Sequence, residues 1–337
     1  MTNPFGIRSL RRGFQVGNPT LQLDTVQGKG PAVISHAHAD HAAENKRMRI
    51  HATAATADLL RVRGHVGEIV VMELDEWLEF DDWRMKLLPA GHILGSAQVL
   101  VERGDGLRLL YTGDMKTRAG RTTELARFEP ADDLIIESTF GLPIFRFPSE
   151  PEVAASMVAF ARDCFDQGLV PVFTGYSLGK GQEIMSILAE AGIPMLIHGA
   201  MWGITKIYEK HGIVFGDYDR FSAGRRSEQR AWVIPPHARP QMTARVPKAR
   251  VCYVSGWALI ESRRDMNRAS LLAPISDHAD YYDLLDVIRE VAPSRVWTVH
   301  GPYADLFALD VARTFGIDAC ALDTYVIDEE MIGEAEA

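Results

Sequence analysis

The six residues HAHADH that begin at His36 constrain this chain more than any other part of its sequence. The apolar run 32–35 leads into them and predicts a buried strand. Because residues two apart point the same way from an extended backbone, we expect His36, His38 and Asp40 to converge where this strand ends. His41 adjoins Asp40, so a turn there lets this pair face a second point. Nitrogen and carboxylate ligands suit zinc or a neighbouring transition metal.

Side chains that face two separate positions indicate two metal ions. Paired metal ions are a device for hydrolysing phosphate and ester bonds. The alternative is a polar, solvated loop that is rich in histidine by chance. We disfavour it because isolated histidines rarely gather in this way directly after a strand.

The composition is that of an ordinary globular protein. The 337 residues are 47% hydrophobic and 24% charged, enough for a large core that normally splits into two domains. The three cysteines are far apart and form no CxxC pair, so we predict neither a disulfide framework nor a thiolate zinc site, as fits a reducing cytoplasm. Residues 1–14 contain no apolar stretch typical of a secretory signal, and no run approaches the length of a membrane span. We therefore expect a cytoplasmic protein without a membrane partner.

The charges are unevenly distributed. The net charge is −9, yet residues 220–268 hold ten arginines and Lys248 against three acidic residues, a local net charge of +8. A basic segment in an acidic protein is typical of a surface that meets a phosphate backbone. The alternative is a solvated surface that is rich in arginine. The stretch from Asp328 to Ala337 has no basic residue, and we expect it to be a frayed end.

The predicted elements change character near residue 150. Before it, short strands alternate with turns, as at 69–72, 85–88, 107–112 and 134–136. After it, helices alternate with strands, which indicates a small parallel α/β domain. We expect helices at 151–167, 182–191, 204–211, 281–291 and 304–315, and strands at 169–173, 194–197 and 296–299.

Four further polar residues each follow an apolar strand and adjoin glycine or serine: His92, Asp114, Glu137 and His300. Core strands of one sheet deliver such residues to a common edge. A single His-Gly at a strand end is weak support by itself. His198-Gly199 has the same appearance, and we assign His198 no metal role.

Taken together, these residues resemble the metallo-β-lactamase superfamily in their order along the chain. A strand that ends in Asp24 comes first, then HAHADH, His92 and Asp114. The later segments resemble the β-CASP nuclease branch, with EST at 137–139 as its motif A, SDHAD at 276–280 as its motif B and HG at 300–301 as its motif C. The resemblance runs from about Leu21 to Pro302, and at this length it is strongest to bacterial DNA ligase-associated exonucleases.

This resemblance implies an α/β fold, with an αββα metallo-β-lactamase sandwich and an inserted β-CASP α/β domain. The corresponding boundaries are 1–145 for the first part of the sandwich, 146–268 for the insert and 269–337 for the C-terminal part of the sandwich.

The resemblance also implies a ligand set. One metal ion would be held by His36, His38 and His92, the second by Asp40, His41 and His300, with Asp114 bridging the two. Two divalent ions are expected, with zinc first and manganese as the alternative, because histidine and aspartate sites accept both. Asp24 would orient a ligand histidine, against the alternative of an ordinary aspartate in a turn.

The expected catalytic residues are Asp40, Glu137 and His278. Two cations would bring the pKa of a shared water near neutrality, and the hydroxide so supplied is expected to attack phosphorus in line. His278 is the candidate acid for the leaving sugar oxygen, because imidazole titrates in the right range. Glu137 is expected to orient His278 and to raise its pKa.

Polar and basic residues near these motifs are candidates for binding the substrate backbone. They are Ser177 and Lys180 in the loop 175–181, Lys116 and Arg118 after Asp114, and Arg263 after the turn 255–257. The loop joins a strand to a helix, so its amides and the helix N-terminus are suited to an anion, although its spacing is not that of a Walker A motif. The alternative for each residue is a structural turn or a solvated charge.

These expectations combine into a metal-dependent phosphodiesterase that acts on nucleic acid, with a DNA exonuclease in repair as the first hypothesis. A DNA ligase and a helicase are partners implied by the resemblance alone. An RNA-processing nuclease is the alternative, because a histidine at motif C is more typical of the RNA enzymes of this family. A small-molecule hydrolase would need neither the insert nor Glu137 and His278. A non-catalytic scaffold is disfavoured, since no predicted ligand is missing.

Overall fold

The computed structural model describes residues 2–42, 45–222, 229–243 and 248–322. Within these residues the chain forms two compact units, of which one contains the chain up to Arg146 and again from His278, and the other contains Phe147–Asp277. The second boundary lies later than the predicted 268/269, because strand β17 (Leu271–Ala273) pairs with a strand of the second unit. No helix in the described part of the chain is long and apolar enough to cross a membrane.

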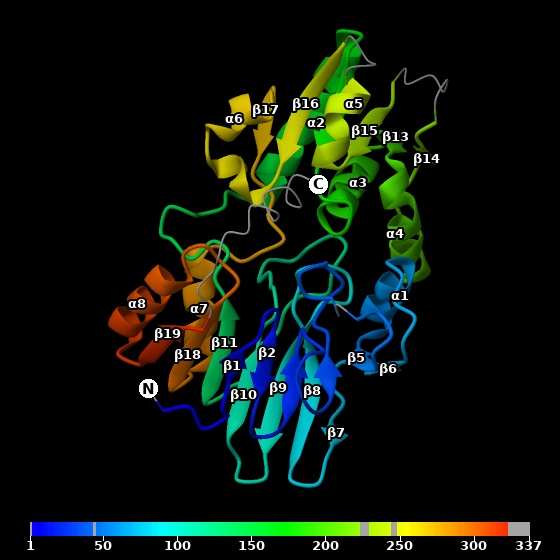
Figure 1. Cartoon of the computed structure of the whole chain (residues 1–337). Helices are drawn as coiled ribbons and strands as arrows, with labels where there is room; N and C mark the ends of the chain where they lie inside the picture. Colours follow the sequence, from blue (N-terminus) through cyan, green and yellow to red (C-terminus); the bar gives the residue numbers. More distant parts are fainter. Residues whose placement is uncertain (1, 43–44, 223–228, 244–247, 323–337) are drawn as a thin grey trace. The chain divides into compact units, whose positions relative to one another are not determined.

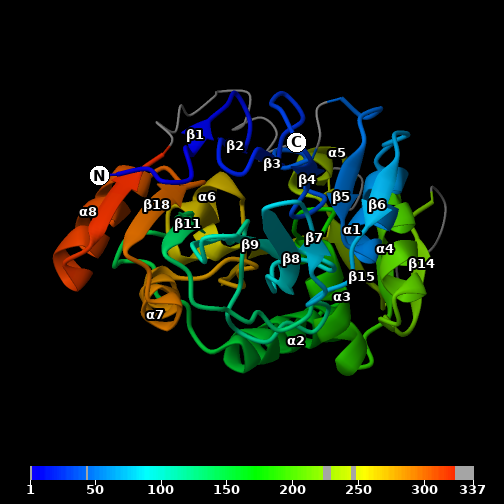
Figure 2. The ribbon, with the colours of Figure 1, turned by 90° about the horizontal axis from the view of Figure 1, so that it is seen from below.

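The first unit contains two sheets that form separate layers (Figures 1 and 2). In order across the first sheet, the strands are β1 (Arg8–Ser9), β2 (Phe14–Val16), β3 (Leu21–Leu23), β4 (Ala32–Val33), β5 (Ile50–Ala52) and β6 (Ile69–Val71). Those of the second sheet are β19 (Asp318–Ala321), β18 (Arg295–Val299), β11 (Asp133–Glu137), β10 (Arg108–Tyr111), β9 (Ala97–Arg103), β8 (Trp83–Pro89) and β7 (Leu78–Glu79).

Strict alternation along the second sheet divides its side chains between two cores. Leu87 belongs to the core that includes Phe14 of the first sheet, whereas Leu88 belongs to the core under α7 (Tyr281–Val291) and α8 (Ala304–Phe315). Each fully buried leucine of this kind stabilises the fold by about 1.5–3 kcal/mol. Helix α1 (Ala54–Val62) contacts β6 of the first sheet. The layers are therefore helix, sheet, sheet and helix, and the predicted αββα sandwich is confirmed.

Parallel pairing brings the ends of several strands to one edge of this sandwich. Strand β11 pairs in parallel with β10 and with β18, and β3 pairs in parallel with β4. The residues that follow these strands include Asp24, Ser35, Asp114 and His300, and Glu137 is the last residue of β11. The fold thus positions the candidate residues because the carboxyl ends of parallel strands meet at one edge.

The second unit is built on a parallel sheet of six strands. In order, these are β14 (Tyr218–Arg220), β13 (Met195–Ile197), β15 (Ala231–Ile234), β12 (Val170–Thr174), β16 (Ala249–Val254) and β17. Its α-helices are α2 (Glu150–Asp166), α3 (Lys180–Glu190), α4 (Gly199–Lys210), α5 (Arg239–Thr243) and α6 (Arg263–Met266), with short 3₁₀ turns η1 (Pro236–Ala238) and η2 (Gly256–Leu259). Helix α4 begins earlier than the predicted residue 204 because Nδ1 of His198 accepts a hydrogen bond from Ala200 N at 3.2 Å and caps it.

Asp133 joins two strands of the first unit through a buried ion pair. It accepts hydrogen bonds from Arg295 Nε (2.9 Å) and Nη2 (2.6 Å) and from Trp297 Nε1 (3.1 Å). We predict that Asp133→Ala lowers the free energy of unfolding by about 3 kcal/mol, because it leaves a largely buried guanidinium without its partner. Chemical denaturation measures this value.

The matched control is Asp286→Ala, which breaks an exposed pair with Arg289 in the same unit. It should change the free energy of unfolding by less than about 0.5 kcal/mol. Equal losses in the two variants would contradict the structural role of Asp133.

Candidate metal centre

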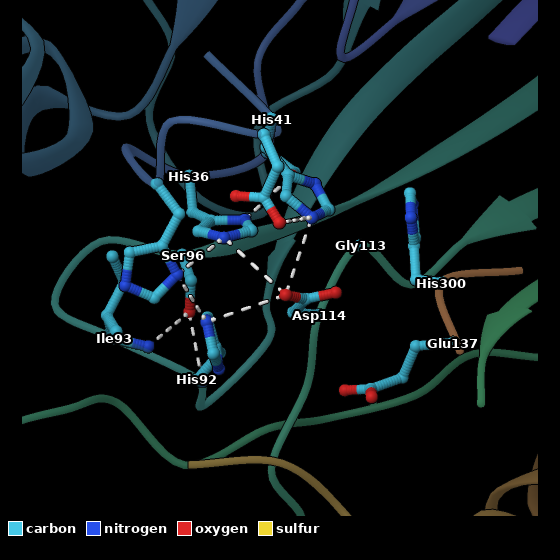
Figure 3. Close-up of polar contacts among 12 residues, drawn as sticks. His36, His41, His92, Ile93, Ser96, Gly113, Asp114, Glu137 and His300 are labelled. Atoms are coloured by element: carbon cyan, nitrogen blue, oxygen red, sulfur yellow. Dashed lines mark hydrogen bonds and ion pairs between the residues drawn. The ribbon is translucent and has the colours of Figure 1, made fainter. Parts of the chain in front are cut away.

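Three histidine rings converge on one point beside the end of β4 (Figure 3). His38 Nδ1 lies 3.1 Å from His36 Nε2 and 3.0 Å from His92 Nε2. Asp114 Oδ2 lies 3.7 Å from both of these Nε2 atoms. Because His36 and His92 are buried, a cation placed between these nitrogen atoms would be shielded from water. Three imidazole nitrogens and one carboxylate oxygen form the donor set that zinc binds in tetrahedral sites.

Asp114 also faces a second pair of candidate ligands. Its Oδ2 lies 3.4 Å from His41 Nε2, and the same nitrogen lies 3.8 Å from Asp40 Oδ2. The other oxygen of Asp114, Oδ1, is buried and makes no hydrogen bond. A buried carboxylate oxygen without a donor costs free energy unless a cation is present. The residues present therefore fit a divalent metal ion, as predicted for this centre.

Local backbone geometry explains why glycine precedes Asp114. Gly113 has φ +55°, and a Cβ atom there would lie 2.9 Å from Ser35 Cβ. A larger residue would clash with the strand end that carries His36 and would strain the turn. His92 is held in a similar way by its own loop, where Ser96 Oγ accepts hydrogen bonds from His92 N (3.0 Å) and Ile93 N (3.2 Å) (Figure 3).

Burial and neighbouring charges shift the pKa values of His36 and His41 in opposite directions. Burial lowers the pKa of His36 well below its usual value, and the charges of His41 and His92 lower it further. Burial also disfavours a charged His41, but the carboxylates of Asp114 and Asp40 outweigh it and hold the pKa of His41 well above its usual value. Although burial acts against ionisation of Asp114, His41 lowers the pKa of that carboxyl well below its usual range.

Asp24 and His300 both lie beside His41. Asp24 is buried, and its Oδ2 accepts a hydrogen bond from His41 Nδ1 at 2.8 Å. This bond leaves His41 Nε2 toward Asp114, and the orienting role of Asp24 stays a prediction. The ring of His300 lies beside that of His41 and is tilted to it by 50°, with ring centroids 4.5 Å apart, and His300 Nε2 lies 3.0 Å from the hydroxyl of Tyr111. His300 and Asp24 both have positive φ values, a strained conformation that is common at functional sites.

Glu137 holds His278 near the same centre. Both Glu137 oxygens lie close to His278 Nδ1, at 3.0 and 3.1 Å, and Oε1 also accepts a hydrogen bond from Met115 N at 2.6 Å. Glu137 is fully buried, whereas the side chain of His278 is 19% exposed. With Nδ1 committed to Glu137, the nitrogen of His278 that remains for chemistry is Nε2.

The spacing of Asp114, Glu137 and His278 would also suit a metal ion, since one ligand atom from each lies within 4.8 Å of the others. Both Glu137 oxygens already take part in hydrogen bonds, however, and Oε1 would have to release a backbone amide. The cluster around His36 has the donor set with the stronger fit.

Arg118 contacts acidic residues at the start of α7. Its Nη2 donates to Asp280 Oδ2 at 2.5 Å, and its Nε lies 3.2 Å from Asp283 Oδ2. Asp280 caps α7 by accepting from Tyr282 N and Asp283 N. In this arrangement Arg118 fixes the chain two residues after His278, and its role in binding substrate stays a prediction.

The other predicted substrate contacts are also engaged within the fold. Lys116 is buried, and Lys180 Nζ lies 3.0 Å from Asp277 Oδ1. Arg263 lies over the ring of Trp257, with 5.9 Å between Cζ and the ring centroid. Ser177 is half-buried, and its carbonyl accepts a hydrogen bond from Gln182 Nε2 at 3.1 Å.

The glycine loop that precedes α3 differs from the expected anion cradle. Gly179 N donates to Gln182 Oε1 at 2.9 Å, and Gly181 N donates to Tyr176 O at 2.8 Å. These two amides are therefore used inside the loop. The geometry is that of a capped helix start, which was the structural alternative for this segment.

The arginine-rich stretch is partly neutralised by acidic residues from outside it. Arg230 pairs with Asp217 at 3.0 Å, and Arg250 pairs with Asp163 at 2.7 Å. The charge count along the sequence does not include these partners, so it overstates the positive surface. Arg225, Arg226, Glu228 and Arg245 lie outside the described residues, as does the acidic stretch 328–337.

Sequence patterns did not single out the polar groups behind the histidines. Ser35 and Tyr111 lie in strands that were expected to be apolar core, and Thr139 was named only as part of the EST motif. Thr139 Oγ1 lies 3.4 Å from His278 Nδ1 and donates to His300 O at 3.0 Å. The one available signal was position, since Ser35 and Tyr111 stand close to predicted ligands along the chain.

Comparison with known proteins gives matches over most of the chain. Residues 273–321 match a family model described as a Zn-dependent metallo-hydrolase RNA specificity domain. The chain is 36% identical over 296 residues to a protein named "Probable DNA ligase" from Opitutus terrae, which covers 86% of this chain and 28% of that protein. It is 29% identical over 209 residues to an "RNase J-like protein" from Methanocaldococcus jannaschii, which covers 52% of this chain and 49% of that protein. The chain thus spans less than half the length of either relative.

A solved structure shares the fold. A protein of unknown function from Enterococcus faecalis V583 matches with a TM-score of 0.57 at 13% identity, over 83% of this chain and 79% of that chain. At this identity the match bears on the fold alone.

The pKa of His41 leads to a test of metal binding. Since its pKa is raised, His41 carries a second proton at pH 7 in the metal-free protein, and a metal ligand must lose it. We predict that zinc binding at pH 7 releases this proton and that the release fades as the pH rises through the raised pKa. Calorimetric titration in buffers of different ionisation enthalpy counts the protons.

His41→Ala should lower the number of released protons by about one, because His36 has a lowered pKa and contributes none at pH 7. His211→Ala, in the second unit, is the control and should leave the count unchanged. The same count in the wild type and in His41→Ala would show that His41 gives up no proton to the metal.

Proposed function

Because the chain belongs to the β-CASP nuclease branch of the metallo-β-lactamase superfamily, we propose that it is a metal-dependent nuclease that hydrolyses phosphodiester bonds. One observation carries this proposal. A cluster of histidines around Asp114 lies next to one further histidine, His278. Glu137 holds Nδ1 of His278 by a hydrogen bond. A metal centre activates water, and an oriented imidazole supplies a proton, which are the two needs of phosphodiester hydrolysis.

The number and the identity of the metal ions are part of this proposal. His36, His38 and His92 would hold one ion, and Asp40 and His41 a second with His300 beside them. Asp114 would be shared by the two. Zinc is the first choice and manganese the second, since the donor set accepts both. When bound, such ions lower the pKa of water and polarise phosphoryl oxygens.

The chain's own residues divide the remaining work. Asp114 and Asp40 bring negative charge to the centre, while His278 presents Nε2 as the proton donor for the leaving sugar oxygen. Glu137 fixes the ring, because its hydrogen bonds to Nδ1 are made before substrate arrives. Met115 N in turn holds Glu137.

DNA is the proposed substrate, with an exonuclease role in repair. The relative named as a probable DNA ligase matches over 86% of this chain, a larger share than the 52% matched by the relative named RNase J-like. A DNA ligase or a helicase as partner, and a cytoplasmic location, belong to this proposal.

RNA is the alternative substrate on a specific observation. The family model that matches residues 273–321 is described as an RNA specificity domain, and this segment contains His300. The alternative therefore keeps the same metal centre and replaces DNA by RNA as the substrate. One cleavage assay distinguishes the two substrates.

We predict that the zinc-loaded or manganese-loaded protein cleaves 5′-labelled single-stranded DNA faster than RNA of the same sequence. Asp40→Ala should lower the rate by at least about 100-fold, the effect expected when a charge at the reacting centre is removed. Asp81→Ala, an exposed aspartate of the same unit, is the matched control and should leave the rate unchanged.

Cleavage of RNA alone would replace the DNA proposal with the alternative. If neither strand is cleaved with either metal, the nuclease proposal fails and a small-molecule hydrolase takes its place.

His278→Ala tests the assignment of the proton donor. With a natural phosphodiester we expect the rate to fall by about 10²–10⁴-fold, whereas with a p-nitrophenyl ester, whose leaving group needs no proton, the loss should shrink to within about tenfold. His237→Ala is the control. A loss of the same size on both substrates would show that His278 is not the acid.

A further inference from the structure

One buried carboxylate lies behind several of the candidate ligands. Asp24 Oδ2 accepts hydrogen bonds from Ser35 Oγ (2.7 Å), His41 Nδ1 (2.8 Å) and Tyr111 Oη (2.7 Å). Its Oδ1 accepts from Ser35 N at 2.6 Å. Asp24 is 1% exposed, so these four donors rather than water satisfy it. With three donors directed at Oδ2, this oxygen acts only as an acceptor.

The direction of these bonds fixes where each proton lies. A hydroxyl has one hydrogen, so Ser35, which donates to Asp24, must accept from its other neighbour, His36 Nδ1, at 3.0 Å. The hydroxyl of Tyr111 likewise has one hydrogen. It donates this hydrogen to Asp24 and must therefore accept from His300 Nε2 at 3.0 Å. If Tyr111 donated to His300 instead, two acceptors would face each other at 2.7 Å in a buried site.

We propose that Tyr111 is a positioning residue that fixes the tautomer of His300: its hydroxyl keeps the proton on Nε2, so that Nδ1 carries the lone pair with which His300 binds a metal ion. This inference rests on the proposed function for the presence of that ion. The carboxylate of Asp24 also fixes the tautomers of His36, through Ser35, and of His41, directly. In both histidines Nδ1 is engaged, so Nε2 is left to bind a metal ion. His300 thus differs from these two histidines in the nitrogen that it presents.

The role of the Tyr111 hydroxyl can be tested apart from the packing of its ring. The ring is fully buried and lies edge-on to Phe14, with 5.7 Å between centroids. Tyr111→Phe keeps this contact and removes only the hydroxyl. Tyr281→Phe is the matched control, because it also removes a tyrosine hydroxyl from beside a carboxylate in the same unit, Asp310 at 3.4 Å.

Histidine-selective ¹⁵N NMR on the zinc-loaded full-length chain reads the tautomers, with His300→Gln to assign the signal. We expect His300 to be protonated on Nε2, with this proton slow to exchange in the wild type and in Tyr281→Phe but fast in Tyr111→Phe. The signal of His36 should be unchanged in Tyr111→Phe and altered in Ser35→Ala. Protonation of His300 on Nδ1, or an exchange rate that Tyr111→Phe leaves unchanged, would overturn the inference.

Zinc titration against a competing chelator gives the second readout. Tyr111→Phe should weaken the binding of one zinc ion by about 10–100-fold and leave that of the other unchanged, the usual effect of removing a group that orients a ligand. Unchanged affinity for both ions would overturn the role of Tyr111 while the proposed function stands. A wild-type chain that binds no zinc would overturn the proposed function itself, and the inference with it.

Discussion

The rest of the centre depends on the buried carboxylate of Asp114. One of its oxygens faces the Nε2 atoms of three histidines at 3.4–3.7 Å, and the other makes no hydrogen bond. Burial lowers the pKa of His36, while the carboxylate of Asp114 acts against burial and raises the pKa of His41. A divalent ion bound here would take the place of protons on the histidine lone pairs. We therefore expect metal binding to stabilise this edge of the fold.

Two buried carboxylates play similar parts on either side of Asp114. Asp24 holds Nδ1 of His41, and Glu137 holds Nδ1 of His278, so each leaves Nε2 for chemistry. Parallel strand pairing puts both acids behind their histidines, and neither histidine then has to be ordered when a ligand arrives. The difference between them lies in what Nε2 faces, which for His41 is the carboxylates of Asp114 and Asp40. The same arrangement thus yields a metal ligand in one place and a candidate proton donor in the other.

Local patterns were enough to predict several helices, whereas the sandwich and the ligand set were implied by the resemblance to the metallo-β-lactamase superfamily. Helices α7 and α8 begin and end at the predicted residues, because their apolar spacing is regular and the caps are encoded nearby. The roles of charged residues were harder to predict, because their partners come from distant parts of the chain. Arg118 pairs with Asp280, 162 residues later, and no sequence window contains both. Tyr111 was missed for a related reason, since a tyrosine in a core strand looks apolar until its hydroxyl is placed between Asp24 and His300.

Anomalous diffraction at the zinc absorption edge, from crystals of the zinc-loaded chain, tests the central claim most directly. The account predicts two peaks, one within bonding distance of His36, His38 and His92 and one within bonding distance of Asp40 and His41, with Asp114 contacting both. A peak at Glu137 and His278, or the absence of any peak around Asp114, would contradict it.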